Sequence, residues 1–270
     1  MSKIDQSEKD ALAMAAHEAA DAARHVTLSY FRNGQLGTSN KARRGFDPVT
    51  RADREAEEAM RAVLQRLRPH DAVLGEEHGE TPGTSGLTWV LDPIDGTRGF
   101  ISGTPTWGTL ISVRDAGGPL FGLIDQPWTD ERFVGGFGRA ALHRHGRTVP
   151  LTVRPAPGLG EAILFSTFPE IGTPDEAAAF AALSQEVMLT RYGMDCYAYA
   201  LLAAGNIDLV VEAGLFAYDV QAPIAVIEAA GGIVTDWRGR PVHEGGRVLA
   251  AASRELHEAA LEILARAPEG

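Results

Sequence analysis

Two carboxylates stand close together in a stretch of the sequence that could bind both a metal ion and a phosphate. Residues 89–100 read Trp-Val-Leu-Asp-Pro-Ile-Asp-Gly-Thr-Arg-Gly-Phe, which places Asp92 and Asp95 just before Gly96 and Thr97. Carboxylate oxygens bind hard cations such as Mg²⁺, and backbone N–H groups at the start of a helix bind phosphate. The stretch therefore indicates a metal-assisted phosphate site, with an ordinary turn as the simpler alternative.

The residues around Asp92 predict the strand that would position both carboxylates. Residues 87–91 are apolar and rich in strand formers, so they predict a buried strand. The strand is expected to end at Asp92, because Pro93 has no N–H group to donate to a sheet ladder. Residues 95–97 combine a turn signal with a helix start.

Asp53 lies near the start of a second predicted element, a helix that runs to residue 67. Thr50 is expected to cap this helix, and Asp53 at the third helical position would complete a capping box with it. A capped helix end is also a rigid place to hold a catalytic base. A structural and a catalytic role for Asp53 are therefore compatible.

Two glutamates follow another predicted strand. Residues 72–74 predict the strand, and Glu76 and Glu77 come just after it. Adjacent glutamates on a loop are usually solvated, but next to a strand that ends at Asp92 they become candidate metal ligands. His78 has no second His or Cys at zinc-ligand spacing, which favours an all-oxygen, magnesium-type site.

Three acidic residues of the second half are also placed at the ends of predicted elements. Asp195 and Asp219 each precede an apolar helix, so the simplest interpretation of both is an N-cap. Glu212 ends a predicted strand, where a surface position is the simplest interpretation. The alternative is that all three belong to one site.

Taken together, these motifs resemble those of the inositol monophosphatase superfamily, Mg²⁺-dependent and lithium-sensitive phosphatases, over most of the chain. The resemblance implies that two or three Mg²⁺ ions are bound by Glu76, Asp92, Asp95, Asp219 and the carbonyl group of Ile94. It implies that Asp53 and Thr97 orient the attacking water, with Glu76 also serving catalysis. Gly96 and Thr97 would hold the phosphate through their N–H groups.

The resemblance also places the organic part of the substrate. Arg191, Asp195 and Glu212 stand where the family contacts it, and two carboxylates would suit a positively charged substrate. Lys41, in the polar loop 34–46, is the nearest match to a lysine on the family's mobile loop, at a spacing one residue longer. The alternative for this loop is a solvated segment without a role in the site.

Two further strings distinguish branches of the superfamily. Asp-Gly-Thr-Arg-Gly-Phe-Ile-Ser-Gly at residues 95–103 and Gly-Met-Asp-Cys-Tyr-Ala-Tyr at residues 193–199 look more like the histidinol-phosphate phosphatases than the inositol branch. We therefore expect hydrolysis of L-histidinol phosphate, a step of histidine biosynthesis. The alternatives are an inositol-1-phosphatase, a broader sugar or nucleotide phosphatase, or a non-catalytic interaction module.

The pattern along the rest of the chain predicts an α/β protein in two halves. A long amphipathic helix is expected over residues 7–31, an antiparallel meander over 107–137, and alternating strands and helices after residue 160. The Pro- and Gly-rich residues 155–160 divide an α+β half (1–154), which carries most of the metal ligands, from an α/β half (155–270). The resemblance implies one compact α-β-α-β-α sandwich with mixed and antiparallel sheets.

The amino-acid composition limits the classes of partner that the protein is expected to bind. The 270 residues carry a formal net charge of −11, with a pI near 5.2, which argues against nucleic acid as a primary partner. No apolar run approaches the ~20 residues of a membrane helix. A single cysteine, Cys196, rules out an internal disulfide and favours a cytoplasmic protein. The partner is thus a small phosphorylated substrate, and the resemblance suggests a homodimer.

Overall fold

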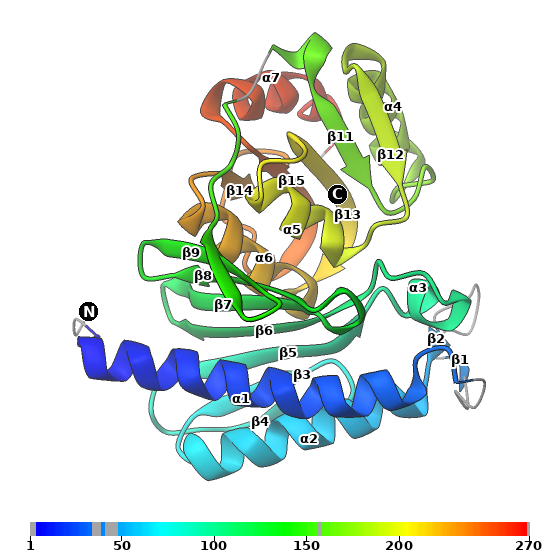
Figure 1. Ribbon diagram of the computed structural model, residues 1–270. Helices are drawn as coiled ribbons and strands as arrows, with labels where there is room; N and C mark the ends of the chain where they lie inside the picture. Colours follow the sequence, from blue (N-terminus) through cyan, green and yellow to red (C-terminus); the bar gives the residue numbers. More distant parts are fainter. Residues whose placement is uncertain (1–3, 34–38, 41–47, 156–157, 269–270) are drawn as a thin grey trace.

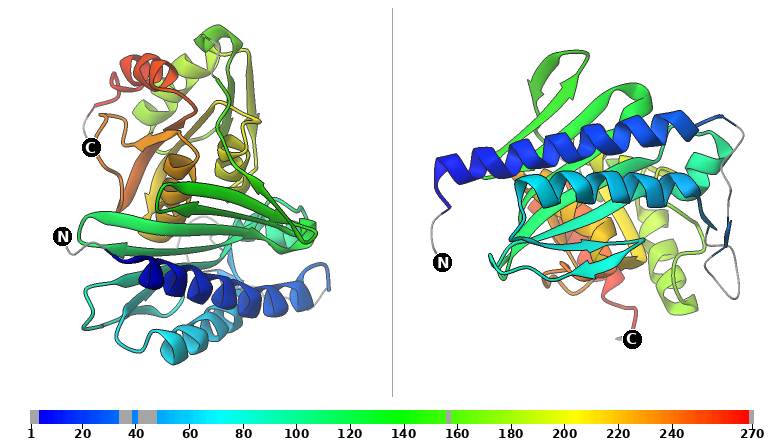
Figure 2. Two further views of the ribbon diagram at one scale, coloured as in Figure 1. Left: turned by 60° about the vertical axis from the view of Figure 1, so that its left-hand side comes forward. Right: turned by 90° about the horizontal axis from the view of Figure 1, so that it is seen from below.

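The computed structural model describes residues 4–33, 39–40, 48–155 and 158–268, in five alternating layers of helices and strands (Figure 1). Its helices include α1 (Gln6–Tyr30), α2 (Arg51–Leu67), α4 (Pro174–Glu186), α5 (Cys196–Ala203), α6 (Ala217–Ala229) and α7 (Arg254–Leu264). α1 and α2 cover one face of an eight-stranded sheet, α5 and α6 lie between this sheet and a five-stranded one, and α4 and α7 cover the far side (Figures 1 and 2). The predicted α-β-α-β-α sandwich is confirmed.

The eight-stranded sheet carries the predicted meander. Its strands, in spatial order, are β10 (Arg147–Pro150), β9 (Arg139–Arg144), β8 (Glu131–Gly136), β7 (Gly118–Gln126), β6 (Gly108–Asp115), β5 (Thr88–Asp95), β3 (Ala72–Gly75) and β4 (Gly79–Thr81). Neighbours from β5 to β10 are antiparallel, whereas β3 runs parallel to β5. The sequence did not predict β4, because its three exposed residues carry no apolar alternation.

The prediction that the strand ends at Asp92 was wrong. β5 continues to Asp95, and its register with β6 shifts between Asp92 and Asp95, so that Pro93 and Ile94 lie in a β-bulge. A bulge leaves residues outside the regular ladder, so the missing N–H group of Pro93 costs no hydrogen bond there. The carbonyl of Pro93 accepts a hydrogen bond from Thr109 Oγ1 at 2.8 Å. The bulge therefore presents both carboxylates from one strand.

Helix α6 lies directly on the backbone of the eight-stranded sheet. A Cβ atom added to Gly122 in β7 would come within 2.5 Å of the carbonyl oxygen of Ala222. One added to Gly135 in β8 would come within 2.3 Å of the Cα atom of Val226. Nonbonded atoms do not approach so closely, so both positions require glycine. The glycines let the helix approach the sheet and bring its first turn to the end of β5.

The second sheet is mixed and has its own core. Its strands, in spatial order, are β12 (Leu189–Tyr192), β11 (Ile163–Ser166), β13 (Leu209–Phe216), β15 (Gly245–Ala251) and β14 (Ile233–Thr235). β11 is parallel to both of its neighbours, and β15 is antiparallel to both of its own. Buried side chains of α4 and α7, among them Phe180 and Leu256, form the outer core with this sheet. None of the described helices is long and apolar enough to cross a membrane.

The remaining elements are short. They are α3 (Thr97–Ser102), the 3₁₀ turns η1 (Pro127–Thr129) and η2 (Leu159–Glu161), and the ladder of β1 (Ser39–Asn40) with β2 (Pro48–Val49). α3 begins at Thr97, within the residues 95–97 where the sequence predicted a helix start. The proposed lid residue Lys41 lies outside the described residues.

Candidate active site

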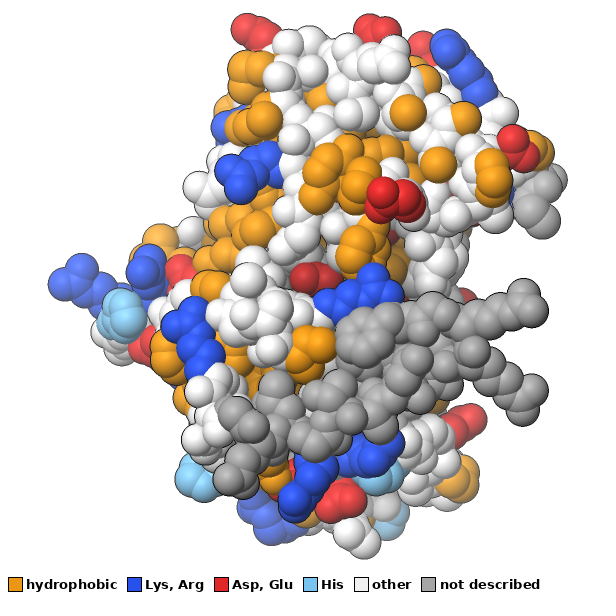
Figure 3. Space-filling view, turned by 90° about the vertical axis from the view of Figure 1, so that its right-hand side faces the viewer, with side chains coloured by type: hydrophobic (Ala, Val, Ile, Leu, Met, Phe, Trp, Pro, Cys, Tyr) orange, Lys and Arg blue, Asp and Glu red, His pale blue; other side chains and the backbone are white. Residues whose placement is uncertain are grey.

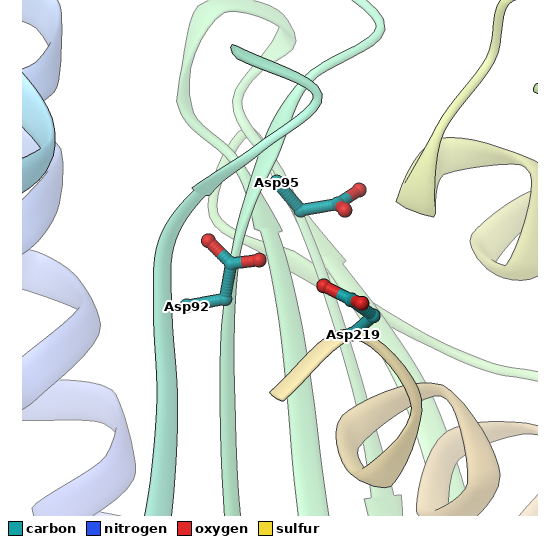
Figure 4. A group of neighbouring side chains, drawn as sticks. All are labelled: Asp92, Asp95 and Asp219. Atoms are coloured by element: carbon teal, nitrogen blue, oxygen red, sulfur yellow. The ribbon is translucent and has the colours of Figure 1, made fainter. Parts of the chain in front are cut away.

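Three carboxylates from two layers converge at the end of β5. Asp92 and Asp95 come from the strand and Asp219 from the first turn of α6, and one oxygen of each lies within 4.8 Å of the others (Figure 4). They line a cavity of about 310 Å³, together with Glu76, Ile94, Gly96, Thr97, Arg98, Thr167, Phe168, Asp195, Glu212, Ala213, Gly214, Leu215, Phe216 and Tyr218. The sequence placed most of these acids in one site, and the fold brings them together.

The local structure fixes each of the three carboxylates. Asp92 Oδ1 accepts a hydrogen bond from the N–H of Ile94 at 3.0 Å, within the bulge. Asp95 Oδ2 accepts one from the N–H of Cys196 at 2.6 Å, at the start of α5. Asp219 Oδ2 accepts one from the N–H of Phe216 at 2.7 Å. Backbone N–H groups of the bulge and of two helix starts therefore orient all three carboxylates.

Asp219 is not the N-cap that the sequence predicted. α6 begins at Ala217 rather than at residue 221, so Asp219 occupies the third helical position and Phe216 the N-cap. Pro223 therefore lies in the interior of the helix, whereas the sequence suggested a position near its first turn. Proline has no N–H group and is usually tolerated only in the first turn of a helix, so its presence suggested a helix start close to residue 223.

The three carboxylates hold protons more tightly than usual in this structure. Burial raises the pKa of Asp95 and of Asp219 to about 7, and the charges of the neighbouring acids add to the effect. Burial and the charges of Glu76, Asp95 and Asp219 raise the pKa of Asp92 well above its usual value. Clustered buried anions become favourable when a cation neutralises them. The all-oxygen donor set fits a hard cation of the Mg²⁺ type.

These shifts predict the pH dependence of the metal-free protein. Asp95 and Asp219 bind protons more tightly when folded than unfolded, so their stabilising contribution is complete below about pH 4 and is lost as the pH rises through about 7. With a chelator, Tm should fall between pH 5 and pH 8, and Mg²⁺ should restore it at pH 8. Thermal denaturation measures both effects. A metal-free protein more stable at pH 8 than at pH 6 would contradict the prediction.

Asp53 connects the start of α2 with Thr97, which lines the cavity. Its Oδ2 accepts hydrogen bonds from the N–H and hydroxyl groups of Thr50 at 2.8 and 2.5 Å, which confirms the capping box. Its Oδ1 lies 3.5 Å from Thr97 Oγ1, which also lies 3.2 Å from the carbonyl oxygen of Ile94. Burial raises the pKa of Asp53 to about 6, opposed by the bonds from Thr50. The two predicted partners, Asp53 and Thr97, are thus neighbours.

The sequence analysis missed the residue that holds the Glu76 loop. Glu57 on α2 is fully buried, and its carboxylate accepts hydrogen bonds from the N–H groups of Glu77 at 2.7 Å and His78 at 3.2 Å. Arg61 Nε donates a third at 2.7 Å. Glu57 follows Asp53 by one helical turn, on the same face as apolar core positions. A charged residue in that stripe was the signal that could have found it.

Glu57→Ala is expected to destabilise the protein and to loosen the Glu76 loop. Two backbone N–H groups lose their acceptor, which costs about 1–3 kcal/mol for each buried group left unpaired. Because both N–H groups are only partly buried, the free energy of unfolding should fall by about 1–3 kcal/mol in total, and half-maximal activity should need more Mg²⁺. Denaturant unfolding and a Mg²⁺ titration measure these effects, with Glu262→Ala on the exposed face of α7 as the control. Equal effects in the two variants would refute this role for Glu57.

Two of the predicted substrate residues line the cavity. Asp195 stands at the N-cap position of α5 but makes no capping bond, and its backbone has φ 46°, a left-handed value. A Cβ atom on Gly96 would come within 2.9 Å of the Asp195 side chain, so its carboxyl group lies against the Asp-Gly-Thr turn. Burial, and then the charge of Asp95, raise the pKa of Asp195 to about 7, opposed by Arg98.

Glu212 is not the surface residue that its strand-end position suggested. It is 5% exposed, and its Oε1 accepts hydrogen bonds from the N–H and hydroxyl groups of Thr167 at 2.7 and 2.8 Å. Burial raises its pKa to about 8, and the bonds from Thr167 oppose this. Glu212 therefore fastens the loop after β11. Arg191 is exposed on β12 and is not among the residues that line this cavity, so its predicted substrate contact stays a prediction.

Comparison with known proteins places this chain among phosphatases. The sequence matches the inositol monophosphatase family over residues 8–269. A bifunctional chloroplastic phosphatase of Arabidopsis thaliana is 39% identical over 97% of this chain and 78% of its own length. A histidinol-phosphatase of Streptomyces coelicolor is 36% identical over 92% of this chain and 95% of its own. A solved inositol monophosphatase from Zymomonas mobilis has a TM-score of 0.83 and 38% identity, covering 97% of this chain and 99% of that one.

Proposed function

Because this chain belongs to the inositol monophosphatase family, a family of phosphatases, we propose that it is a Mg²⁺-dependent enzyme that hydrolyses L-histidinol phosphate to L-histidinol and phosphate. The observation that carries the proposal is the convergence of Asp92, Asp95 and Asp219 in one cavity that also holds Asp195 and Glu212. The similarity to a histidinol-phosphatase supports this substrate.

The chemistry of the metal follows from the donor set. Two or three Mg²⁺ ions would be held by the carboxylates of Glu76, Asp92, Asp95 and Asp219 and by the carbonyl group of Ile94. When bound, such ions lower the pKa of water and neutralise charge on a phosphoryl group. Every one of these donors lines the cavity, and all of them are oxygen atoms, so the residues fit the ion.

The chain's own groups orient the reaction. The Thr97 hydroxyl lies 3.2 Å from the Ile94 carbonyl oxygen and 3.5 Å from Asp53 Oδ1, so it can hold a water molecule and pass its proton towards Asp53. With a pKa raised to about 6, Asp53 suits a base that acts near neutral pH. The N–H groups of Gly96 and Thr97, which line the cavity, would bind the phosphoryl oxygens.

The cationic end of the substrate is assigned to Asp195 and Glu212. The ammonium and imidazole groups of histidinol would form charge-assisted hydrogen bonds with these carboxylates. Oε1 of Glu212 accepts both hydrogen bonds from Thr167, and Oε2 accepts one long bond from Ser166 Oγ at 3.5 Å, so a substrate group would compete most easily for Oε2. Asp195 makes no capping bond and is therefore the cleaner probe of substrate recognition.

Asp195→Asn is expected to lower kcat/KM for L-histidinol phosphate by about ten- to a hundredfold, the scale of one charge-assisted hydrogen bond. Hydrolysis of glycerol-2-phosphate should change little, because its neutral alcohol makes no such bond. Steady-state kinetics on both substrates measure the ratio, with Glu186→Gln at the exposed end of α4 as the control. An equal loss on both substrates would assign Asp195 to structure instead.

A second candidate substrate is inositol-1-phosphate. The similarity to the Zymomonas mobilis inositol monophosphatase favours it. Phosphate release from histidinol phosphate, inositol-1-phosphate, fructose-1,6-bisphosphate and 3′-phosphoadenosine-5′-phosphate separates the candidates by kcat/KM. The absence of turnover on every one of these esters with Mg²⁺ would leave a non-catalytic interaction module as the function.

The cellular setting is part of the same proposal. We infer a cytoplasmic homodimer of the histidine biosynthesis pathway that lithium inhibits. Family membership supports the dimer and the lithium effect. The formal net charge of −11 is consistent with the absence of a nucleic-acid partner.

A further inference from the structure

A planar cation is stacked on an aromatic ring at the rim of the candidate site. The guanidinium carbon of Arg98 lies 4.6 Å from the ring centroid of Phe168, and both side chains line the cavity. Arg98 comes from α3, beside the eight-stranded sheet, and Phe168 from the loop after β11. The contact therefore joins the two sheet-bearing parts of the molecule across the opening. Figure 3 shows that face, with hydrophobic and acidic side chains above a hollow and basic ones below it.

The loop that carries Phe168 is fastened in place. Thr167 donates both its N–H and its hydroxyl group to Glu212, and Ser166 Oγ lies 3.3 Å from the carbonyl oxygen of Phe168. Phe168 itself is 41% exposed, so its ring contributes little to the core. A large aromatic side chain that is held at the surface, beside a cavity, points to a role in binding.

A carboxylate lines the same cavity as the Arg98 guanidinium. Asp195 lines the same cavity, and the positive charge of Arg98 acts on it against the larger effects of burial and of Asp95. An aromatic face and a carboxylate are the two partners that proteins use to bind flat cations such as guanidinium and imidazolium. The aromatic face of Phe168 and the carboxylate of Asp195 are such partners, and the flat cation beside them is the guanidinium of Arg98.

We propose that Phe168 and Asp195 form a subsite for a flat cationic group of the substrate, and that Arg98 occupies this subsite until the substrate displaces it. The choice of imidazole as that group rests on the proposed function. A neutral polyol has no cationic group that could replace the stacked guanidinium. Arg98 should therefore lower the affinity for such a substrate. Specificity then arises from competition with an internal ligand as well as from attraction.

Binding of free L-histidinol to the Mg²⁺-loaded protein tests the proposal without requiring hydrolysis. Arg98→Gln removes the competitor and should tighten binding by about three- to fivefold, the scale of an exposed cation–π contact. Phe168→Leu in the Arg98→Gln background should abolish this gain. Arg66→Gln, an exposed arginine paired with Glu18 at the end of α2, removes the same charge elsewhere and should have no effect. Isothermal titration calorimetry measures all four proteins.

Two comparisons separate a stacked subsite from a simple change of charge. Ethanolamine, an amino alcohol without a ring, should gain nothing from Arg98→Gln, and an equal gain would overturn the role of the ring. Arg98→Lys keeps the charge but not the planar stack, so it should bind histidinol more tightly than wild type and less tightly than Arg98→Gln. Weaker or unchanged histidinol binding in Arg98→Gln would refute the proposal.

The same experiment distinguishes this proposal from the assignment of the substrate. If histidinol binds with the expected dependence on Arg98 and Phe168 while histidinol phosphate is not hydrolysed, the subsite stands and the proposed reaction fails. If histidinol phosphate is hydrolysed and the variants bind histidinol like wild type, the reaction stands and the subsite fails. Both variants change surface side chains, and their thermal denaturation curves establish that they are folded.

Discussion

Asp92→Asn is expected to abolish phosphatase turnover in a protein that remains folded. The amide has the size and shape of the carboxyl group, and its oxygen can still accept the hydrogen bond from the N–H of Ile94 that shapes the bulge. The variant lacks the negative charge at the centre of the proposed Mg²⁺ site, where Asp95 and Asp219 alone cannot provide the same donor set. Phosphate release at saturating Mg²⁺ measures the loss.

The same variant should be more stable than the wild type when no metal is present. Asp92 is 2% exposed, and the charges of Glu76, Asp95 and Asp219 oppose its ionisation. Removing one buried charge relieves that repulsion, so Tm in chelator should rise while the increase in Tm with Mg²⁺ should disappear. Asp175→Asn on the exposed start of α4 is the matched control. Near-normal turnover of folded Asp92→Asn would overturn the metal assignment.

Thr97→Ala is expected to lower kcat by roughly 10²–10³, the scale for loss of a group that acts at the chemical step. The hydroxyl is the only part of the side chain that lies between Asp53 and the Ile94 carbonyl, whereas the backbone N–H that would bind phosphate remains. KM should therefore change little. Steady-state kinetics over a range of pH separate the two parameters and report on Asp53.

Thr97→Ser provides the control, because it keeps the hydroxyl and loses only a methyl group. It should retain most of the activity and the wild-type pH profile. A large increase in KM for Thr97→Ala with kcat unchanged would show that the hydroxyl binds substrate and does not orient the attacking water.

Local sequence patterns predicted much of this fold because the relevant forces are local. The apolar run before Asp92, the alternating residues of β6 to β8 and the Thr50–Asp53 capping box each depend on neighbours in the chain. The acid cluster was predictable because strand ends and helix starts gather at the same edge of a sheet. The resemblance to a known family then placed Glu76 and Asp219 beside Asp92.

The remaining features depend on contacts between distant residues. Glu57 holds the Glu76 loop from a position 20 residues away, and Glu212 fastens Thr167 from 45 residues away. No local pattern encodes either pairing. Proline normally ends a regular strand, and the sequence prediction applied this rule to Pro93. The bulge that accommodates Pro93 becomes visible only in the pairing of β5 with β6. The resemblance assigned Arg191 to the substrate, whereas its strand β12 lies at the edge of the second sheet.

The glycines beneath α6 have a consequence for how freely this protein can vary. Gly122 and Gly135 set the height of the helix above the sheet, and through it the position of Asp219, although neither residue lines the cavity. Substitutions of Phe168 or Arg98 at the rim should therefore leave the proposed metal ligands in place. Any side chain added at the two glycines would lift the helix as a whole. The absence of side chains at these two positions thus sets the separation between the layers, and with it the position of Asp219.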